Sequence, residues 1–255
     1  MIRVGLPVGL LIGLTGIGSG SLLTPLLILL GSMSPATAVG TSISFSFLTK
    51  LYGSWKLYRR GLVNTEIVRD LSVGCLPGVL AGAFVIRYLN VRWPDVMNAF
   101  LQQSIGVALI VVAMMAARLL PDSKRLGVLD RPLLLSNALR RLFIIAVAFV
   151  VGVSMTVTSI GSGTALIPAM ILFYRLDSGG LVGTNLFVGT ILAATAGIPQ
   201  LGFGHIDWRA VASLVCGSIP ALWVSSLVHS GLPRHVTDGI IAGALMVMGV
   251  YIIGL

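Results

Sequence analysis

Charge is scarce in this 255-residue chain. Only 10% of its residues are Asp, Glu, Lys or Arg, against 56% hydrophobic residues. A soluble domain carries roughly 25% charged residues, and the mean hydropathy here is +1.01. This composition excludes an ordinary soluble protein and predicts an all-α polytopic membrane protein. Residues 1–3 lead directly into an apolar run without an A-x-A site, so we expect the first segment to be retained rather than cleaved as a signal.

Acidic side chains are absent from the middle of every apolar run. The 8 Asp and Glu residues all fall in or beside the polar connections. Intramembrane carboxylates are the usual cation ligands and proton relays of pumps and transporters, so their absence argues against a cation carrier. The 17 Lys and Arg residues are typical of loops that fix orientation in a membrane, rather than of nucleic-acid binding.

The sequence also lacks the residue groups of enzymes and metal sites. It has 2 cysteines and 3 histidines, with no metal-ligand cluster, no Ser/His/Asp arrangement within a segment and no carboxylate pair. Cys75 and Cys216 lie within apolar segments, where a small buried side chain is the simpler interpretation. We therefore expect a protein that is not an enzyme and that has no cofactor and no metal.

Apolar segments fall at about residues 4–31, 36–58, 68–89, 96–119, 140–174, 180–203, 210–229 and 236–254. A helix of about 20 residues spans a bilayer, so most of these segments fit single transmembrane helices. The first and the fifth segments are too long for one upright helix. Each of these two is either a re-entrant hairpin or one broken and tilted span.

Glycine motifs interrupt these two long segments, at residues 16–21 (GIGSGS) and 159–164 (SIGSGT). Glycine is unfavourable inside a helix, and broken backbone within a membrane is tolerated only where it is buried in protein or lines a cavity. A helix that starts just after such a break points its positive N-terminal end into that cavity, where an anion can bind. The alternative interpretation is that the glycines permit close packing of helices.

The two halves of the chain repeat in register when one is shifted by 143 residues. The shift aligns Thr15 with Thr158, Gly18 with Gly161, Ser19 with Ser162, Gly20 with Gly163, Pro25 with Pro168, Thr41 with Thr184, and Gly61 with Gly204. We therefore predict two homologous membrane repeats, residues 1–119 and 140–255, joined by a linker at 120–139. Each repeat would hold a glycine-broken, re-entrant helix plus three transmembrane helices. Such repeats are common in secondary transporters, which bind substrate at the repeat interface.

Charge alone leaves the orientation of the halves open. If the glycine segments cross the membrane, the halves are parallel and the N-terminus is cytoplasmic. If they are re-entrant, the halves are inverted and the N-terminus is outside. The loops divide about twelve to four in Lys and Arg in either case. We favour the re-entrant alternative, because paired broken segments at corresponding positions mark binding sites in such folds.

The candidate binding residues are glycines and polar residues at the two breaks and in the helices that follow. They are Gly18, Ser19, Gly20, Ser21, Gly161, Ser162, Gly163 and Thr164 at the breaks, and Thr41, Ser42, Lys50, Thr184 and Asn185 beyond them. Buried hydroxyl and amide groups need partners, which are either the backbone at the breaks or a ligand. Lys50 lies well inside an apolar segment, and its ammonium either binds an anion or extends to the membrane interface.

These motifs resemble the TauE/SafE family of sulfite-exporter-like permeases. The resemblance rests on residues 16–20 (GIGSG) with Pro25, on residues 38–42 (AVGTS) and on residues 59–64 (RRGLVN). It covers nearly the whole chain, because the second half repeats these motifs as GSG, GTN and GHID. Many members have three successive glycines at the first break, where this chain has Ser19 in the middle. The resemblance implies a multi-pass carrier of the bacterial or archaeal inner membrane for sulfite, sulfonates or related small sulfur-containing anions.

We therefore expect a secondary transporter of the cell inner membrane that moves a small sulfur-containing oxyanion, such as sulfite or an organosulfonate. The anion would lie between the two glycine-rich breaks, and access would alternate between the two sides. An anion channel, or a carrier of another small organic anion, is the alternative. The expected partners are a small anionic substrate and membrane lipid. Nucleic acid is not expected, and a homodimer is left open.

Overall fold

The computed structural model describes residues 19–119, 137–161, 163, 165–174, 176, 178–228 and 234–254. These residues form helices joined by short connections, with no strand among them. The helices are α2 (Ser19–Leu29), α3 (Pro35–Arg59), α4 (Thr65–Arg92), α5 (Pro94–Leu119), α7 (Asn137–Thr158), α8 (Leu166–Phe173), α9 (Ser178–Phe203), α10 (Trp208–Val228) and α11 (Arg234–Gly254). The predicted all-α fold class is confirmed.

Four stretches are long and apolar enough to cross a membrane, which confirms a multi-pass membrane protein. They are Thr65–Arg92, Pro94–Met114, Leu139–Thr158 and Gly179–Phe203. Helix α3 is also long, with 25 residues, but it is not in this group because Ser, Thr and Lys side chains interrupt its apolar residues. Helix α3 is therefore long enough to span a membrane but is rich in polar side chains.

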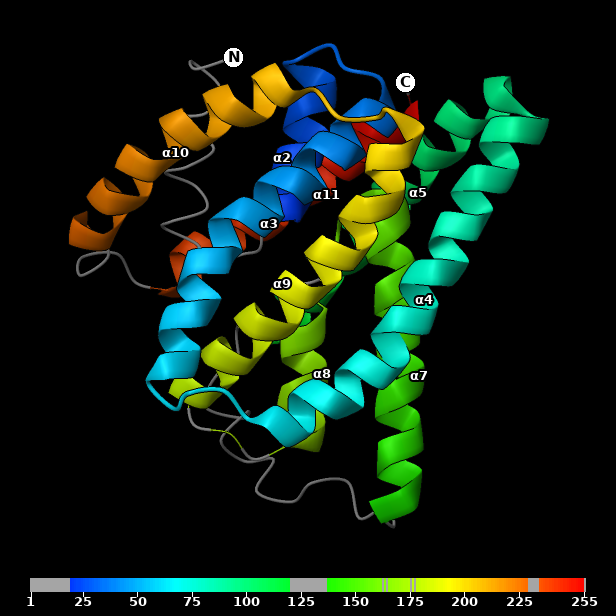
Figure 1. Cartoon of the computed structure of the whole chain (residues 1–255). Helices are drawn as coiled ribbons and strands as arrows, with labels where there is room; N and C mark the ends of the chain where they lie inside the picture. Colours follow the sequence, from blue (N-terminus) through cyan, green and yellow to red (C-terminus); the bar gives the residue numbers. More distant parts are fainter. Residues whose placement is uncertain are drawn as a thin grey trace.

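Helices α3 and α9 lie side by side in antiparallel orientation (Figure 1). Near the start of α3, the Thr41 hydroxyl accepts a hydrogen bond of 3.1 Å from the backbone N–H of Asp207, just after α9. Near the start of α9, the Thr184 hydroxyl accepts one of 3.0 Å from the backbone N–H of Asn64, just after α3. Each helix start is thus tied to the connection that follows the other helix.

The two connections are built alike. Gly61 and Gly204 both have φ +71°, a left-handed conformation that glycine adopts at little cost. The next helix in each case is capped by a side-chain oxygen, from Asn64 at the start of α4 and from Asp207 at the start of α10. Helices α3 and α9 begin 143 residues apart, as do α4 and α10.

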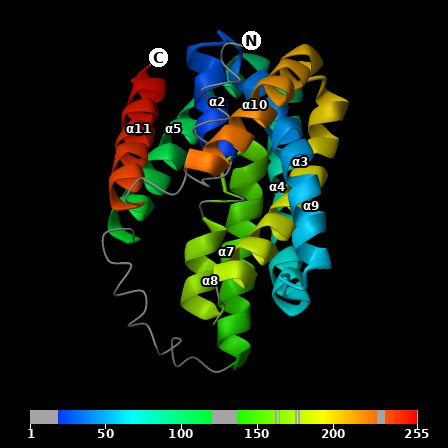
Figure 2. The same ribbon diagram turned by 90° about the vertical axis from the view of Figure 1, so that its left-hand side faces the viewer.

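The fifth apolar segment folds back on itself. Helix α7 crosses the molecule, the chain reverses at residues 159–165, and α8 returns beside it (Figure 2). The Phe143 and Phe173 rings lie 5.3 Å apart, and the Arg140 guanidinium lies 5.6 Å from the Tyr174 ring. The two ends of this segment therefore lie close together. Residues 1–18, which would form its equivalent, lie outside the described residues, so the arrangement of the two halves stays a prediction.

Helices α4 and α7 run parallel and in close contact through glycine. A Cβ atom added at Gly74 or Gly78 would overlap the backbone of α7, and one at Gly152 would overlap the backbone of α4. Glycines spaced four apart allow helix backbones to approach closely within a membrane. Packing at this interface fixes α7, and with it the turn at residues 159–165, to the first half of the chain.

Candidate functional site

The described residues of the two glycine motifs meet inside the protein. The start of α2 lies directly on the turn that follows α7, and a Cβ atom at Gly20 would overlap the carbonyl oxygen of Ser159. The Thr24 hydroxyl donates a hydrogen bond of 3.1 Å to the Ser159 hydroxyl. Because Gly20 is buried and Ser159 is 1% exposed, this contact is in the interior.

The turn after α7 is held in an unusual backbone conformation. Ser159 has φ +63° and Gly161 has φ +143°, and a non-glycine residue at positive φ is uncommon. Local hydrogen bonds stabilise it. The Ser154 hydroxyl donates to the carbonyl of Ile160 over 3.1 Å, and the Thr158 hydroxyl accepts from the N–H of Ile160 over 3.1 Å. Strained backbone that the surroundings enforce is often found at functional sites.

The predicted residues at the breaks are only partly described. Gly20 and Ser21 lie in the first turn of α2, and Ser21 is 2% exposed and has an interaction partner. Gly161 and Gly163 are buried. Gly18, Ser162 and Thr164, and the side chain of Ser19, lie outside the described residues. The structure therefore brings Gly20 to the turn that contains Gly161, and the substrate-binding role of this set stays a prediction.

Helix α3 presents a polar stripe to the interior. Ser42, Ser46, Lys50 and Ser54 recur every four residues, which places them along one side of the helix, and they are 0%, 0%, 7% and 3% exposed. The hydroxyl oxygens of Ser42 and Ser46 have no hydrogen-bond partner in the part of the chain that the structure describes. Lys50 has an interaction partner, and its burial shows that the side chain does not extend to an exposed interface.

Buried polar groups without partners are costly. The unpaired hydroxyls of Ser42 and Ser46 are therefore the clearest sign of a ligand on this surface. Their neighbour Ile43 belongs to the same core cluster as Leu22 of α2 and Ile160 of the turn. The stripe thus belongs to the same interior region as the meeting point of the two breaks.

The four predicted residues of the helices after the breaks are not gathered into one layer. Thr41 and Ser42 lie near the start of α3, and Thr184 and Asn185 lie near the start of the antiparallel α9. Because an α-helix rises about 1.5 Å per residue, Thr184 lies roughly 30 Å from the connection that Thr41 contacts. The Thr41 and Thr184 hydroxyls instead hold the two connections. The Asn185 Oδ1 atom is buried and has no partner among the described residues.

Sequence reasoning missed Thr24 of this interior. Thr24 aligns with Ile167 in the repeat, so no pairing drew attention to it, although it is 0% exposed and bonded to Ser159. Gln200 is 1% exposed and donates to the carbonyl of Thr156 over 3.5 Å. Its other side-chain atom, Oε1, has no partner in the described ranges. For Thr24 and for Gln200, the sequence feature that indicates a role is a polar residue inside an apolar segment.

A charged cluster lies where the α7–α8 hairpin opens. The Arg141 guanidinium donates to the Asp70 carboxylate over 2.7 Å, and the Tyr174 hydroxyl donates to the same carboxylate over 3.4 Å. Burial, together with the Asp70 charge, raises the pKa of Tyr174 to about 12, so the phenol stays protonated and remains a donor. These contacts join α4, α7 and the end of α8 at one rim of the molecule.

Comparison with known proteins agrees with this architecture. The profile of the family described as "Sulfite exporter TauE/SafE" matches residues 1–252. The chain is 33% identical to "Probable membrane transporter protein YjnA" of Bacillus subtilis (strain 168) over 254 residues, covering 99% of this chain and 98% of that protein. It is 24% identical to "Probable membrane transporter protein YunE" of the same organism over 250 residues, with 92% and 88% covered. No solved structure matches the chain.

The family match covers almost every residue discussed above, including both breaks and both connections. The relatives are named as membrane transporters and not as enzymes, and the described helices are those of a multi-pass membrane protein. Together these findings indicate a membrane transporter. The chain belongs to the TauE/SafE sulfite exporter family.

Proposed function

We propose that this protein is a secondary carrier that moves a small sulfur-containing oxyanion, such as sulfite or an organosulfonate, across the cell inner membrane. The observation that carries the proposal is the contact of α2 with the Ser159 turn, beside a helix whose buried Ser42 and Ser46 hydroxyls are unpaired. Free N–H groups at a helix start and unpaired hydroxyls suit an oxyanion. The buried Lys50 on the same stripe adds positive charge. Ser19, Ser162 and Thr164, at the two glycine-rich breaks, would complete the site.

We infer further that the two halves form an inverted repeat. Support comes from the reciprocal hydrogen bonds of Thr41 and Thr184 and from the antiparallel contact of α3 and α9. An exchange of equivalent contacts between antiparallel helices corresponds to a two-fold axis perpendicular to them, in the plane of the membrane. Inverted repeats of this kind allow one half to rock against the other around a central site, which gives alternating access.

The charges at the two ends of the helices suggest the orientation. The end where α3 stops and where α4 and α7 begin holds Lys56, Arg59, Arg60, Arg69, Arg140 and Arg141. The opposite end, where α4 and α9 stop, holds only Arg87, Arg92 and Arg209 among the described residues. Short loops rich in Lys and Arg stay in the cytoplasm, so we assign the first end to the cytoplasm.

Cysteine labelling tests both the inversion and the orientation. In a background with Cys75→Ala and Cys216→Ala, single Arg60→Cys and Arg209→Cys variants are treated in intact cells with a membrane-impermeant maleimide. The two positions follow equivalent helices, one in each half. Inverted halves predict labelling of Arg209→Cys alone, with Arg60→Cys labelled only after the cells are opened. Labelling of both positions from one side would instead mean parallel halves.

The substrate proposal is tested by ligand stabilisation of the detergent-purified protein. A ligand that binds only the folded state raises the melting temperature by mass action, so sulfite, sulfate, thiosulfate, taurine, sulfoacetate, acetate and chloride are compared. The Ser42→Ala/Ser46→Ala double variant should weaken binding by at least about 100-fold, because each hydroxyl bond to a charged ligand contributes about 1.5–3 kcal/mol. Without ligand it should be at least as stable as the parent, because two unpaired buried hydroxyls are removed.

Ser44→Ala is the matched control, since the Ser44 hydroxyl already donates to the carbonyl of Gly40 in its own helix over 3.0 Å. It should leave the ligand-induced shift unchanged. An undiminished shift in the double variant would remove the stripe from the site. A shift with acetate and none with sulfur anions would point to a carrier of another organic anion. Exchange of labelled against unlabelled substrate in proteoliposomes separates a carrier, which supports it, from an anion channel.

A further inference from the structure

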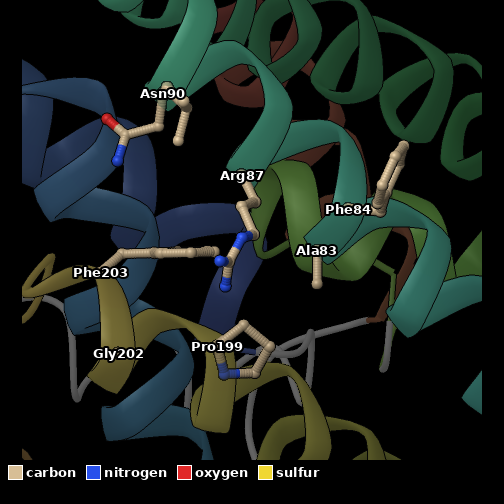
Figure 3. A pocket seen from close by; sticks show the side chains of 8 residues that line it. Ala83, Phe84, Arg87, Asn90, Pro199, Gly202 and Phe203 are labelled. Carbon is tan, nitrogen blue, oxygen red and sulfur yellow. The ribbon is translucent and has the colours of Figure 1, made fainter.

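A cavity that lies apart from the candidate substrate site opens between the C-terminal parts of α4 and α9. Its volume is about 400 Å³, and its lining includes Ala83, Phe84, Arg87, Asn90, Pro199 and Phe203. Figure 3 shows the Arg87 side chain extending from α4 toward α9, with its guanidinium between Pro199 and Phe203. None of these residues belongs to the candidate substrate site.

The exposed side chain of Arg87 has no counter-charge in the part of the chain that the structure describes. Within the described ranges, neither Arg87 nor Asn90 makes an ion pair or hydrogen bond. Arg87 lies five residues before the end of α4 at Arg92, which is about 8 Å along the helix. A cation at that depth is unfavourable unless it reaches water or an anion. The exposed, unpaired Arg87 guanidinium points into the cavity, where an anion that enters from the membrane surface can reach it.

The lining defines the chemistry of that partner. A guanidinium fork binds two oxygens of a carboxylate, sulfonate or phosphate at once, and the Asn90 amide one turn later supplies a further donor. Phe84, which is 69% exposed, and Phe203 make the neighbouring surface apolar. We propose that this cavity binds an oxyanion head group that carries an apolar chain. The two sources of such a ligand are an anionic phospholipid and a soluble organic anion with a short alkyl chain.

The test compares wild type with Arg87→Gln and with Arg92→Gln, a matched control. Arg92 is an exposed arginine of the same helix that does not line the cavity. The purified full-length protein is titrated with phosphatidylglycerol in mixed micelles, with phosphatidylcholine as the zwitterionic reference, and separately with hexanesulfonate. The readouts are the melting temperature and retained lipid by native mass spectrometry. Arg87→Gln should weaken binding by about tenfold or more, and Arg92→Gln should not.

Ala83→Leu is a second variant that keeps Arg87 and Arg92 and fills part of the cavity. It should weaken binding as Arg87→Gln does. A response to phosphatidylglycerol alone that Arg87→Gln weakens assigns the cavity to lipid, and a response to hexanesulfonate alone that Arg87→Gln weakens assigns it to a soluble anion. Equal losses in Arg87→Gln and Arg92→Gln, or no response of wild type to either probe, would overturn the proposal. Transport is not used as a readout, so this result is independent of the proposed substrate.

Discussion

Helices α3 and α9 begin 143 residues apart, lie antiparallel, and use the same Gly-Thr pair to contact the connection after the other helix. Their buried faces nevertheless differ. Where α3 carries Ser42, Ser46, Lys50 and Ser54, the aligned positions of α9 are Asn185, Gly189, Ala193 and Gly197. Helix α9 is consequently apolar enough to be recognised as a membrane span, and α3 is not.

The comparison separates what the fold needs from what the ligand needs. Both helices have a Gly-Thr pair, Gly40-Thr41 in α3 and Gly183-Thr184 in α9. Each pair contacts the connection after the other helix. The polar stripe is present on α3 and not on α9, which fits our proposal of a single ligand path lined from one side. Symmetric residues should therefore affect stability equally in the two halves, whereas asymmetric residues should affect binding.

The largest expected effect is on stability, at the two glycines where the helices meet the connections. A Cβ atom at Gly40 would overlap the carbonyl of His205, and one at Gly183 would overlap the carbonyl of Leu62. Gly40→Ala and Gly183→Ala should each lower the free energy of unfolding by about 3 kcal/mol or more. Gly202→Ala, with no atom near its added Cβ, should be neutral or stabilising by up to about 1 kcal/mol. Thermal unfolding in detergent measures all three variants. A Gly183→Ala variant as stable as wild type would contradict the equivalence of the two helix starts.

The next effect is on binding and concerns Lys50, which has Ala193 as its aligned residue in α9. Lys50→Met keeps the length of the side chain but removes the charge, so the affinity for a small oxyanion should fall by about 10- to 100-fold. Lys56→Met, an exposed lysine on the same helix, is the control and should bind normally. Ligand-induced shifts in melting temperature give both affinities. Equal ligand affinities of the Lys50→Met and Lys56→Met variants would mean that Lys50 does not contact the ligand.

The smallest effect is expected at Thr41 and Thr184, whose hydroxyls accept hydrogen bonds from backbone N–H groups. Thr41→Val and Thr184→Val each leave one donor unpaired, which should cost about 1–3 kcal/mol of stability. The two costs should be similar, and ligand affinity should stay close to that of wild type. A specific loss of affinity in Thr41→Val would show that this hydroxyl also contacts the ligand, in addition to the connection.

Much of the fold follows from the sequence because the hydropathy pattern and the turn and helix-capping residues indicate the same helix boundaries. The segments predicted at 36–58 and 180–203 correspond to α3 and α9 within two residues at either end. The match arises because Gly61, Asn64, Gly204 and Asp207 set turns and caps locally, without reference to the rest of the chain.

The interior was less predictable, because it depends on which surfaces meet. Periodicity places Ser42 and Ser46 on one side of a helix, but it does not reveal that this side is buried and unpaired. The bond from Thr24 to Ser159 joins residues 135 positions apart that share no motif. Likewise, Arg87 resembles any arginine near the end of a membrane helix, and only the packing of α9 beside it creates a cavity.

The exchanged hydrogen bonds of Thr41 and Thr184 also bear on how such a chain could arise. Each bond joins the beginning of one helix to the connection after the end of its counterpart. Two separate copies of a single ancestral half could form both bonds only by inserting into the bilayer in opposite orientations. On the inverted repeat proposed above, a dual-topology ancestor that assembled as an antiparallel pair before gene duplication and fusion would already have had the contact between α3 and α9.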